Sequence, residues 1–215
     1  MVDEMHARLS EIAKRFEHAQ RACAANSAQL AELFGPDHPY CICYIRLGNK
    51  ARYAFEIIEC YAHRFPAGEE LSQDQMERII ETEKWYFIGV LSVVEYSMPE
   101  LIGERGSESL RHMAHNGPFA QFLTKALAEK VIEENEKALF DFLSRVRNDL
   151  IHRNGVSCRS ETINYQGRTF SLRKNEMIEG YWGMLADLGA LATHLVSSVI
   201  KHIEANLQGF PEYEG

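Results

Sequence analysis

Apolar side chains recur every three or four positions along most of this chain, and that spacing predicts α-helices. The first such stretch covers residues 3–33 and is predicted to end at residues 34–36, Phe-Gly-Pro, which interrupt helical backbone. Residues 37–48 contain a short apolar piece that the pattern leaves unassigned. A second helix is expected over residues 50–64, with Asn49 as its cap.

The clearest start signal for a helix lies at Ser72. Gln75 follows three residues later, and the pair predicts a capping box, in which each side chain satisfies a free backbone N–H of the first turn. This helix is predicted to run to about Met98, because Pro99 lacks the N–H that continuation requires. Its second half, residues 85–98, is apolar almost all round, as expected of a helix in the middle of a bundle.

Farther along, residues 103–117 are interrupted by glycines, and Pro118 then suits the first position of another helix. Helical spacing of apolar residues continues from there for about ten turns to Leu150, with a kink allowed around residues 133–136. Residues 154–155, Asn-Gly, predict the end of this helix, because both types tolerate the left-handed backbone of a C-terminal cap.

The pattern changes before the last helix. Two short segments, residues 162–165 and 168–172, flank Gln-Gly and predict a small β-hairpin. A final helix is expected after Asn175 and up to about Leu207. Together the segments predict an all-α, up-and-down helical bundle of four to five long helices with the hairpin inserted before the last one. Short connections make consecutive helices antiparallel neighbours in such a bundle.

The whole chain, residues 1–215, is expected to form a single helical domain, in which residues 1–48 could be an N-terminal helical extension. Its 46% of hydrophobic residues suffices for a core without disulfide or metal staples. No run of 18 or more apolar residues occurs, so we expect no membrane span. The first residues are charged throughout, unlike a secretory signal, and a cytoplasmic protein is expected.

A net charge of −8 constrains binding to nucleic acids. Most sequence-independent affinity for RNA or DNA comes from basic groups that meet phosphates. An acidic chain therefore binds nucleic acid only locally, or together with a partner or a second protomer. We expect a restricted substrate or a gated activity rather than promiscuous binding.

Five cysteines, an odd number at irregular spacing, predict reduced thiols rather than a disulfide framework. One alternative is zinc, because Cys41 and Cys43 together with Cys60 and His63 would supply four ligands of a suitable type. The favoured interpretation is that these cysteines are small buried hydrophobic residues, so no metal and no cofactor is expected.

The most unusual segment is the end of the long helix, which concentrates basic and polar side chains in an otherwise acidic chain. These side chains are Arg145, Arg147, Asn148, Asp149, His152 and Arg153. At about 100° per residue, Arg145, Asn148 and His152 share one face, whereas Arg147 lies about 140° away from His152. Arg147 can reach the same place only through its length, through fraying of the last turn, or across a dimer interface.

These side-chain types suit one reaction. An imidazole takes up and releases a proton near pH 7, as a general acid or base does. A guanidinium binds phosphate in a bidentate manner and stabilises its additional negative charge in a transition state. With no carboxylate cluster to hold a metal, the segment predicts metal-free cleavage of a phosphodiester. RNA is the natural substrate, because its own 2′-OH can be the nucleophile.

The pattern Arg147-Asn148-x-x-x-His152 resembles the signature of HEPN domains, in which an arginine, a polar residue and a short spacer precede a histidine. The resemblance implies a helical bundle that forms a homodimer and brings two such motifs together. It implies a metal-independent endoribonuclease, with His152 as the acid/base, Arg147 at the phosphate and Asn148 as auxiliary polar residue. HEPN enzymes act in toxin–antitoxin, anti-phage defence and RNA-processing systems, so RNA and an antitoxin protein are the implied partners.

Three further side chains are weaker candidates for substrate binding. Arg145 and Arg153 could widen the phosphate-binding patch, or they could be solvated basic residues that the helix end favours. Glu95 stands among apolar neighbours, and it could hold Arg147 or His152. The alternative for Glu95 is a salt bridge or a surface position unrelated to the site.

Two other patterns have simpler explanations. Arg105 and His112 also show the loose Arg–His spacing, but they lie in a stretch broken by glycines, and we interpret them as a chance match. Trp85, Tyr86 and Trp182 could stack on bases, but aromatic residues at helical spacing more often belong to a core.

Three functional hypotheses remain from the sequence. The first is a HEPN ribonuclease that acts as a toxin or in anti-phage defence, with both Arg147/His152 pairs at one cleft. The second is a non-catalytic HEPN domain that binds a nucleotide or a nucleotidyltransferase-type antitoxin. The third is a helical interaction protein without a site, in which His152 is exposed and unpaired.

Overall fold

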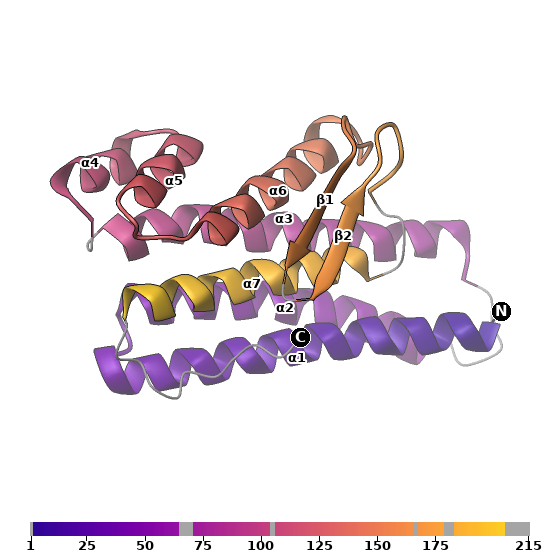
Figure 1. The fold of residues 1–215 in the computed structure, drawn as a ribbon. Helices are drawn as coiled ribbons and strands as arrows, with labels where there is room; N and C mark the ends of the chain where they lie inside the picture. Colours follow the sequence, from indigo (N-terminus) through magenta and orange to yellow (C-terminus); the bar gives the residue numbers. More distant parts are fainter. Residues whose placement is uncertain (1, 65–70, 104–105, 166, 179–182, 205–215) are drawn as a thin grey trace.

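The computed structural model describes residues 2–64, 71–103, 106–165, 167–178 and 183–204. Over these ranges the chain forms seven helices and one two-stranded antiparallel hairpin (Figure 1). In chain order they are α1 (Val2–Phe34), α2 (Pro39–Arg64), α3 (Gln73–Gly103), α4 (Glu108–Asn116), α5 (Phe119–Ala128), α6 (Glu134–His152), β1 (Glu161–Tyr165), β2 (Arg168–Leu172) and α7 (Met184–Ile203). The predicted fold class, an all-α bundle with a hairpin before the last helix, is confirmed.

Consecutive long helices lie side by side, as the short connections predicted (Figure 1). Helix α1 packs along α2, α2 packs along α3, and α7 lies against α3 and also contacts α1. Helix α6 crosses over α3 and α7, and the short helices α4 and α5 cover one end of α3. The hairpin stands beside α6, which contacts β1. The end of α6 and the hairpin therefore form an outer layer of the bundle.

Helix α7 is the centre of the core. Its side chains are buried on nearly every side. Gly189 lets α3 approach closely, because an added Cβ there would clash with the Tyr86 ring. The hydroxyls of Tyr44 and Ser197 share a buried hydrogen bond of 2.6 Å. Among the described residues α7 is the one helix long and apolar enough to cross a membrane, and its central, mostly buried position accounts for that composition.

Helix α2 begins at Pro39, so the predicted start at Asn49 is wrong. The piece that the pattern left unassigned supplies Tyr44 and Leu47, which are buried on the same side of the helix as Ala51. Tyr44, Leu47 and Ala51 thus follow a single helical spacing that passes through Asn49 without a break. Burial of the whole stripe against α1 and α3 therefore favours a single long helix over a cap at this asparagine.

Helix α3 does not stop before Pro99 but continues to Gly103, so the predicted end at Met98 is wrong. A proline inside a helix removes one backbone hydrogen bond and costs roughly 3 kcal/mol. The turn around it buries Met98, Leu101 and Ile102 almost completely. Fully burying a side chain of this size stabilises by about 1.5–3 kcal/mol, so three of them offset the cost of the proline.

The helix predicted to start at Pro118 is in fact two helices, α5 and α6. Lys130 in the break between them has a left-handed backbone with φ of 58°. Glu133 and Glu136 form a capping box at the start of α6, in which Glu136 accepts a hydrogen bond of 2.8 Å from the Glu133 backbone N–H. The acidic run that was expected to allow a kink therefore makes a complete break and starts a new helix.

Two local predictions are confirmed. The Ser72 backbone N–H donates to the Gln75 side chain at 2.7 Å, and the Gln75 N–H donates to the Ser72 hydroxyl at 3.3 Å, which together make the capping box. Strands β1 and β2 pair antiparallel, with Ile163 opposite Phe170. Phe170 is buried in the core cluster, so one face of the hairpin packs on the bundle.

The last helix begins at Met184, later than the start predicted after Asn175, which is wrong. Asn175 has a left-handed φ of 64°. The segment before α7 instead pairs with the loop that follows α6, through an isolated bridge between Val156 and Met177. The predicted end at Leu207 lies outside the described residues.

Residues 1–48, which could be an extension, contribute to the common core of the bundle. Leu9, Ile12 and Phe16 of α1 are buried in one continuous hydrophobic cluster with residues of α2, α3 and α7. The Phe16 ring packs edge-on against the Tyr86 ring of α3, with ring centroids 4.7 Å apart. Helix α1 is thus packed into the bundle rather than attached to its outside.

A buried carboxylate connects α3 to the start of α7. Glu83 is 5% exposed and accepts hydrogen bonds of 3.0 and 3.1 Å from the Gly183 backbone N–H. Arg15 of α1 pairs with Asp187 of α7 at 2.8 Å in the same region. Burial raises the pKa of the Glu83 carboxyl to about 7, although the N–H groups of Gly183 and Ala186 and the charge of Arg15 oppose the rise.

We therefore predict that stability depends on pH through Glu83. Its pKa in the folded chain lies above the value of about 4.3 for an unfolded glutamate. Its contribution to the free energy of unfolding is therefore complete below about pH 4 and is lost as the pH rises through about 7. Chemical denaturation should show Glu83→Gln gaining stability relative to wild type between about pH 5 and pH 8. Glu77→Gln, an exposed position on the same helix, is the control, and parallel curves for wild type and Glu83→Gln would contradict the prediction.

Candidate functional site

Burial of one face of α6 determines where its polar side chains point. Leu139, Leu143, Val146 and Leu150 are buried in the core, and α6 contacts both α3 and α7. The other faces carry the basic and polar residues that the sequence singled out. The helix ends at His152, and Figure 1 shows this end of α6 beside the hairpin.

Arg147 is held between α6 and α3. Its guanidinium donates hydrogen bonds to the Glu95 carboxylate and, at 3.2 Å, to the side-chain oxygen of Asn148. The Ser144 hydroxyl donates to the other oxygen of Glu95 at 3.3 Å. The side chains of Arg147 and Glu95 are each 21% exposed. An ion pair at the edge of the core therefore orients the candidate phosphate-binding group.

The pairing of Glu95 with Arg147, one of the alternatives open from sequence, determines what Arg147 can do. The carboxylate balances the charge of the guanidinium. The Nε atom of Arg147 is buried and has no hydrogen-bond partner among the described residues. A phosphate that binds Arg147 must therefore share it with Glu95 or displace the carboxylate, because both ligands use the same terminal nitrogens.

His152 and Asn148 are exposed, whereas the third predicted catalytic residue, Arg147, is only partly exposed. His152 lies at the last position of α6, and within the described ranges its imidazole forms no hydrogen bond or ion pair. Asn148 lies one turn earlier. The structure thus joins the side chains of Arg147 and Asn148, whereas among the described residues no side-chain hydrogen bond or ion pair joins His152 to either of them.

The two arginines that were expected to widen the phosphate patch differ in how free they are to bind an anion. Arg145 pairs with Glu161 of β1, with a hydrogen bond of 2.8 Å from its Nε atom, and so fastens the hairpin to α6. Arg153 lies 3.9 Å from Asp149 and is 55% exposed. A surface pair at this distance contributes little, so Arg153 is freer to bind an anion than Arg145, whose guanidinium is held by Glu161.

The loop after α6 is fixed by Asp149. This residue is 5% exposed, and its carboxylate accepts a hydrogen bond of 3.2 Å from the Cys158 backbone N–H. Its carbonyl oxygen accepts from the N–H groups of Arg153 and Gly155, both at 3.0 Å. Asn154 has φ of 51° and Gly155 φ of 81°, so the predicted cap at these residues is confirmed. His152 is thereby held in place by helix α6 before it and by the turn that Asp149 fixes after it.

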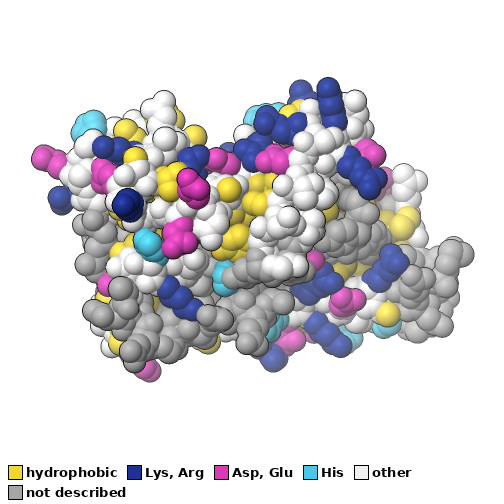
Figure 2. All heavy atoms as spheres, viewed as in Figure 1, with side chains coloured by type: hydrophobic (Ala, Val, Ile, Leu, Met, Phe, Trp, Pro, Cys, Tyr) yellow, Lys and Arg dark blue, Asp and Glu magenta, His cyan; other side chains and the backbone are white. Residues whose placement is uncertain are grey.

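Positive charge is concentrated around this helix end. Residues 145–174 contain seven Arg or Lys and two Asp or Glu, a formal net charge of +5, whereas the whole chain carries −8. Figure 2 shows Lys and Arg side chains gathered over the end of α6 and the hairpin. Arg159, Arg173 and Lys174 are exposed there and were not singled out from the sequence, although a charge count in a sliding window would have found them. We call these three residues, with Arg153, the basic face.

The aromatic residues that were expected in the core separate into different environments. Tyr86 is 4% exposed and belongs to the core, as expected. Trp85 is 62% exposed, so the core interpretation is wrong for it. Helical periodicity does not reveal the exposure of Trp85, because this exposure depends on where α2 packs against α3. Trp182 lies outside the described residues, as does Arg105 of the second Arg–His match.

The four proposed zinc ligands cannot converge. Cys41, Cys43, Cys60 and His63 all lie on the single helix α2, where a rise of 1.5 Å per residue separates the two pairs by about 25 Å. Cys41 and Cys43 are buried, whereas Cys60 is exposed, so the interpretation of Cys60 as a small buried hydrophobic residue is wrong. Over the described ranges no group of three or more His, Cys, Asp or Glu side chains is arranged to hold a metal ion.

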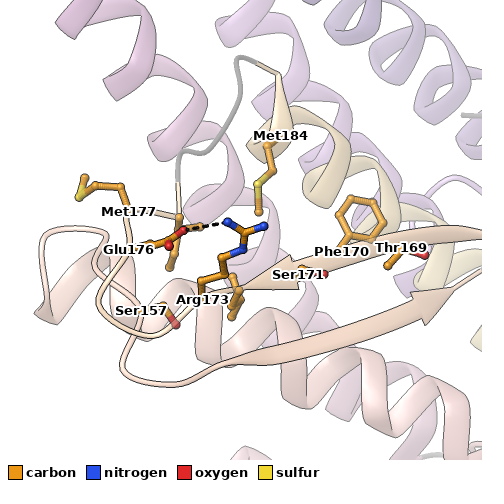
Figure 3. A pocket seen from close by; sticks show the side chains of 10 residues that line it. Ser157, Thr169, Phe170, Ser171, Arg173, Glu176, Met177 and Met184 are labelled. Atoms are coloured by element: carbon orange, nitrogen blue, oxygen red, sulfur yellow. Dashed lines mark ion pairs between the residues drawn. The ribbon is translucent and has the colours of Figure 1, made fainter.

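A cavity of about 390 Å³ lies between β2, the following loop and the start of α7 (Figure 3). Phe170, Leu172 and Met184 form part of its wall, and Arg173 and Glu176 lie 3.7 Å apart at its rim. None of the three predicted catalytic residues lines it. The candidate centre at the end of α6 is therefore an open surface rather than this cavity.

Comparisons of the chain with models of protein families, with characterised proteins and with solved structures found no match. The function must therefore be argued from the side chains of the chain itself.

The contact between Glu95 and Arg147 should be measurable as a coupling energy. A double-mutant cycle of Glu95→Ala and Arg147→Ala, followed by chemical denaturation, is expected to give a coupling free energy of about 1–2 kcal/mol, because the pair is mostly shielded from solvent. The control cycle uses Arg52 and Glu56, an exposed pair 3.7 Å apart on α2, and should give a few tenths of a kcal/mol. Equal coupling in both cycles would contradict the role assigned to Glu95.

Proposed function

We propose that this chain is a metal-independent endoribonuclease of the HEPN type, acting at the end of α6. The observation that carries the proposal is the concentration of positive charge around the end of α6 in an otherwise acidic chain. The exposure of His152, without a partner among the described residues, is shared with the third hypothesis, an interaction protein without a site, and does not separate the two. Phosphates supply most of the sequence-independent affinity of RNA, and they would meet the basic face there. The accessible imidazole of His152 then lies among the groups that attract the substrate.

In this proposal His152 acts on the 2′-OH of RNA. The imidazole accepts the hydroxyl proton while the 2′ oxygen attacks the adjacent phosphorus, and the bond from phosphorus to the 5′ oxygen breaks. A protonated imidazole gives the departing 5′ oxygen its proton. Arg147 stabilises the negative charge that builds up on the phosphate oxygens. The products are a 2′,3′-cyclic phosphate and a 5′-hydroxyl end, and every proton taken up is returned.

The proposal includes a homodimer. Arg147 and His152 are five residues apart on one helix, so their side chains leave it about 140° apart. A second protomer would place its own His152 opposite the first Arg147 and would supply both an acid and a base. Asn148, which contacts Arg147, would then orient the scissile phosphate.

The pair between Glu95 and Arg147 supports a gated or substrate-restricted activity. A phosphate can bind Arg147 only if it weakens or replaces the hydrogen bond between Arg147 and Glu95. The guanidinium therefore adds little affinity for an RNA whose phosphate is not held in place by other contacts. This fits a cytoplasmic toxin or anti-phage enzyme, which is harmful when unrestrained and whose partner would be an antitoxin protein. The same pair also favours the second hypothesis, a HEPN domain that binds a nucleotide or a partner without cleavage, because Arg147 is occupied.

The first test is cleavage of several RNAs by the purified chain in EDTA. Wild type is expected to cut and to leave 5′-hydroxyl ends, whereas His152→Ala and Arg147→Ala are expected to cleave at least about a hundredfold more slowly. His115→Ala is the matched control, because His115 is also an exposed histidine in the last turn of a helix, α4. Cleavage that persists in both site variants would contradict the assignment, and no cleavage by folded wild type would favour the binding hypothesis.

The basic face gives a separate prediction. Replacing Arg159, Arg173 and Lys174 by Ala should weaken RNA binding and should lower the slope of log K against log salt by about 0.7 for each of these cations that meets a phosphate in the wild type. Fluorescence anisotropy with labelled RNA at several salt concentrations measures both quantities. Replacing Arg21 by Ala, an exposed arginine of α1, is the control. Unchanged affinity and slope in the triple variant would show that RNA binds elsewhere.

A further inference from the structure

Helices α2 and α3 leave an exposed aromatic surface next to the candidate site. Tyr53 is 56% exposed and Ile57 45% exposed on α2, while Trp85 and Tyr96 on α3 are each 62% exposed. Side chains of this size forgo favourable burial when they stay in water. These four account for half of the eight large hydrophobic side chains that are exposed in the described residues. Their clustering therefore needs a physical explanation.

Two contacts define how the two helices align. The Arg46 guanidinium lies over the Tyr96 ring, 5.0 Å from its centroid, and the Lys50 side chain would lie 3.1 Å from a Cβ added at Gly89. The helices are antiparallel, so this register carries Tyr53 opposite the turn that holds Trp85. One helical stripe of α2 carries Arg46, Lys50, Tyr53 and Ile57. One stripe of α3 carries Trp85, Gly89, Ser92 and Tyr96. We call these eight residues the α2–α3 platform.

The cations of the α2–α3 platform are not neutralised by acidic side chains of the described residues, although Arg46 also lies over the Tyr96 ring. Arg46 and Lys50 form no ion pair within the ranges that the structure describes. The nearby acids Glu56 and Glu81 are each paired with a cation of their own helix. Glu100, one turn beyond Tyr96, is exposed and marks that end of the surface. Two positive charges that have no acidic partner among the described residues thus alternate with exposed rings, and this favours an anionic ligand with flat apolar groups.

The α2–α3 platform and the candidate site meet on α3, where one residue of each is adjacent in the chain. Tyr96 directly follows Glu95, whose carboxylate holds Arg147. Gly89 and Ser92 are small and separate the two large rings of α3, which lie about 16 Å apart along the helix axis. A strand that leaves Arg147 would therefore meet Tyr96 first and Trp85 next.

We propose that the α2–α3 platform binds single-stranded RNA, an inference that rests on the proposed function and specifies its substrate. Bases stack on Trp85 and on the exposed part of the Tyr96 ring, which is not covered by Arg46. Phosphates contact Arg46 and Lys50, so the scissile phosphate is delivered to Arg147. Exposed aromatic rings combined with cations bind single strands without regard to sequence. A duplex keeps its bases stacked on each other and offers no base face to these rings, so the substrate is unpaired on this side of the cut.

Tryptophan fluorescence tests the stacking directly. The chain has two tryptophans, so Trp182→Phe leaves Trp85 as the reporter. In a full-length His152→Ala, Trp182→Phe protein, oligo(U) of about 12 nucleotides is expected to quench Trp85, and a duplex of the same length is not. Quenching without cleavage by the wild type would keep this inference and reject the proposed catalysis. Binding of oligo(U) seen by anisotropy without any quenching would overturn the inference.

Paired substitutions separate RNA binding from other uses of the same surface. Trp85→Ala with Tyr96→Ala should weaken oligo(U) binding by roughly tenfold to a hundredfold, because each stacked base contributes substantially. Arg46→Ala with Lys50→Ala should lower the slope of log K against log salt by about 1.4. Leu33→Ala, an exposed apolar position on α1, is the control, and circular dichroism verifies folding. If the aromatic variant binds RNA normally but changes from dimer to monomer in light scattering, the α2–α3 platform is an interface between copies and the inference is overturned.

Discussion

The burial of one apolar stripe of α6 against α3 and α7 is the constraint on which the candidate site depends. Because Leu143, Val146 and Leu150 occupy the inner side of the helix, Arg147 faces α3 and His152 faces solvent. The turn after the helix, fixed by Asp149, keeps that end in place. A residue of the candidate site therefore takes its orientation from core packing, and the final turn of α6 is exposed to solvent.

The sequence allowed the bundle and the hairpin to be predicted, because periodicity and capping residues report directly on local structure. Four helix boundaries were wrong. At Asn49 and Pro99, burial of core side chains outweighed the local cap and the local proline. At residues 133–136 a capping box begins a new helix, and after Asn175, which has left-handed backbone, the last helix begins only at Met184. At the site, the sequence left several partners open for Glu95. The rotation of α3 relative to α6 determines that Glu95 meets Arg147, and the sequence pattern does not contain this rotation. The exposure of Trp85 depends in the same way on where α2 lies.

Charge and exposure point to the same side of the molecule. The chain as a whole is acidic, but residues 145–174 contain seven Arg or Lys. One face of the molecule is therefore positively charged while the chain as a whole is negative. Such a field attracts phosphates locally, while the remaining negative charge opposes indiscriminate binding. The ion pair at Arg147 adds a second barrier, because a ligand must compete with Glu95. Both features support the restricted action on RNA that we propose.

The central claim is that the end of α6 cleaves RNA through the substrate's own 2′-OH. The most direct measurement compares, in EDTA, an RNA strand cut by the wild-type chain with the same strand carrying a single 2′-deoxy nucleotide at the cleaved position. We predict that the deoxy strand is not cut at that position and that mass spectrometry finds 2′,3′-cyclic phosphate on the all-RNA product. Equal cleavage of both strands, or cleavage of neither, would contradict this claim.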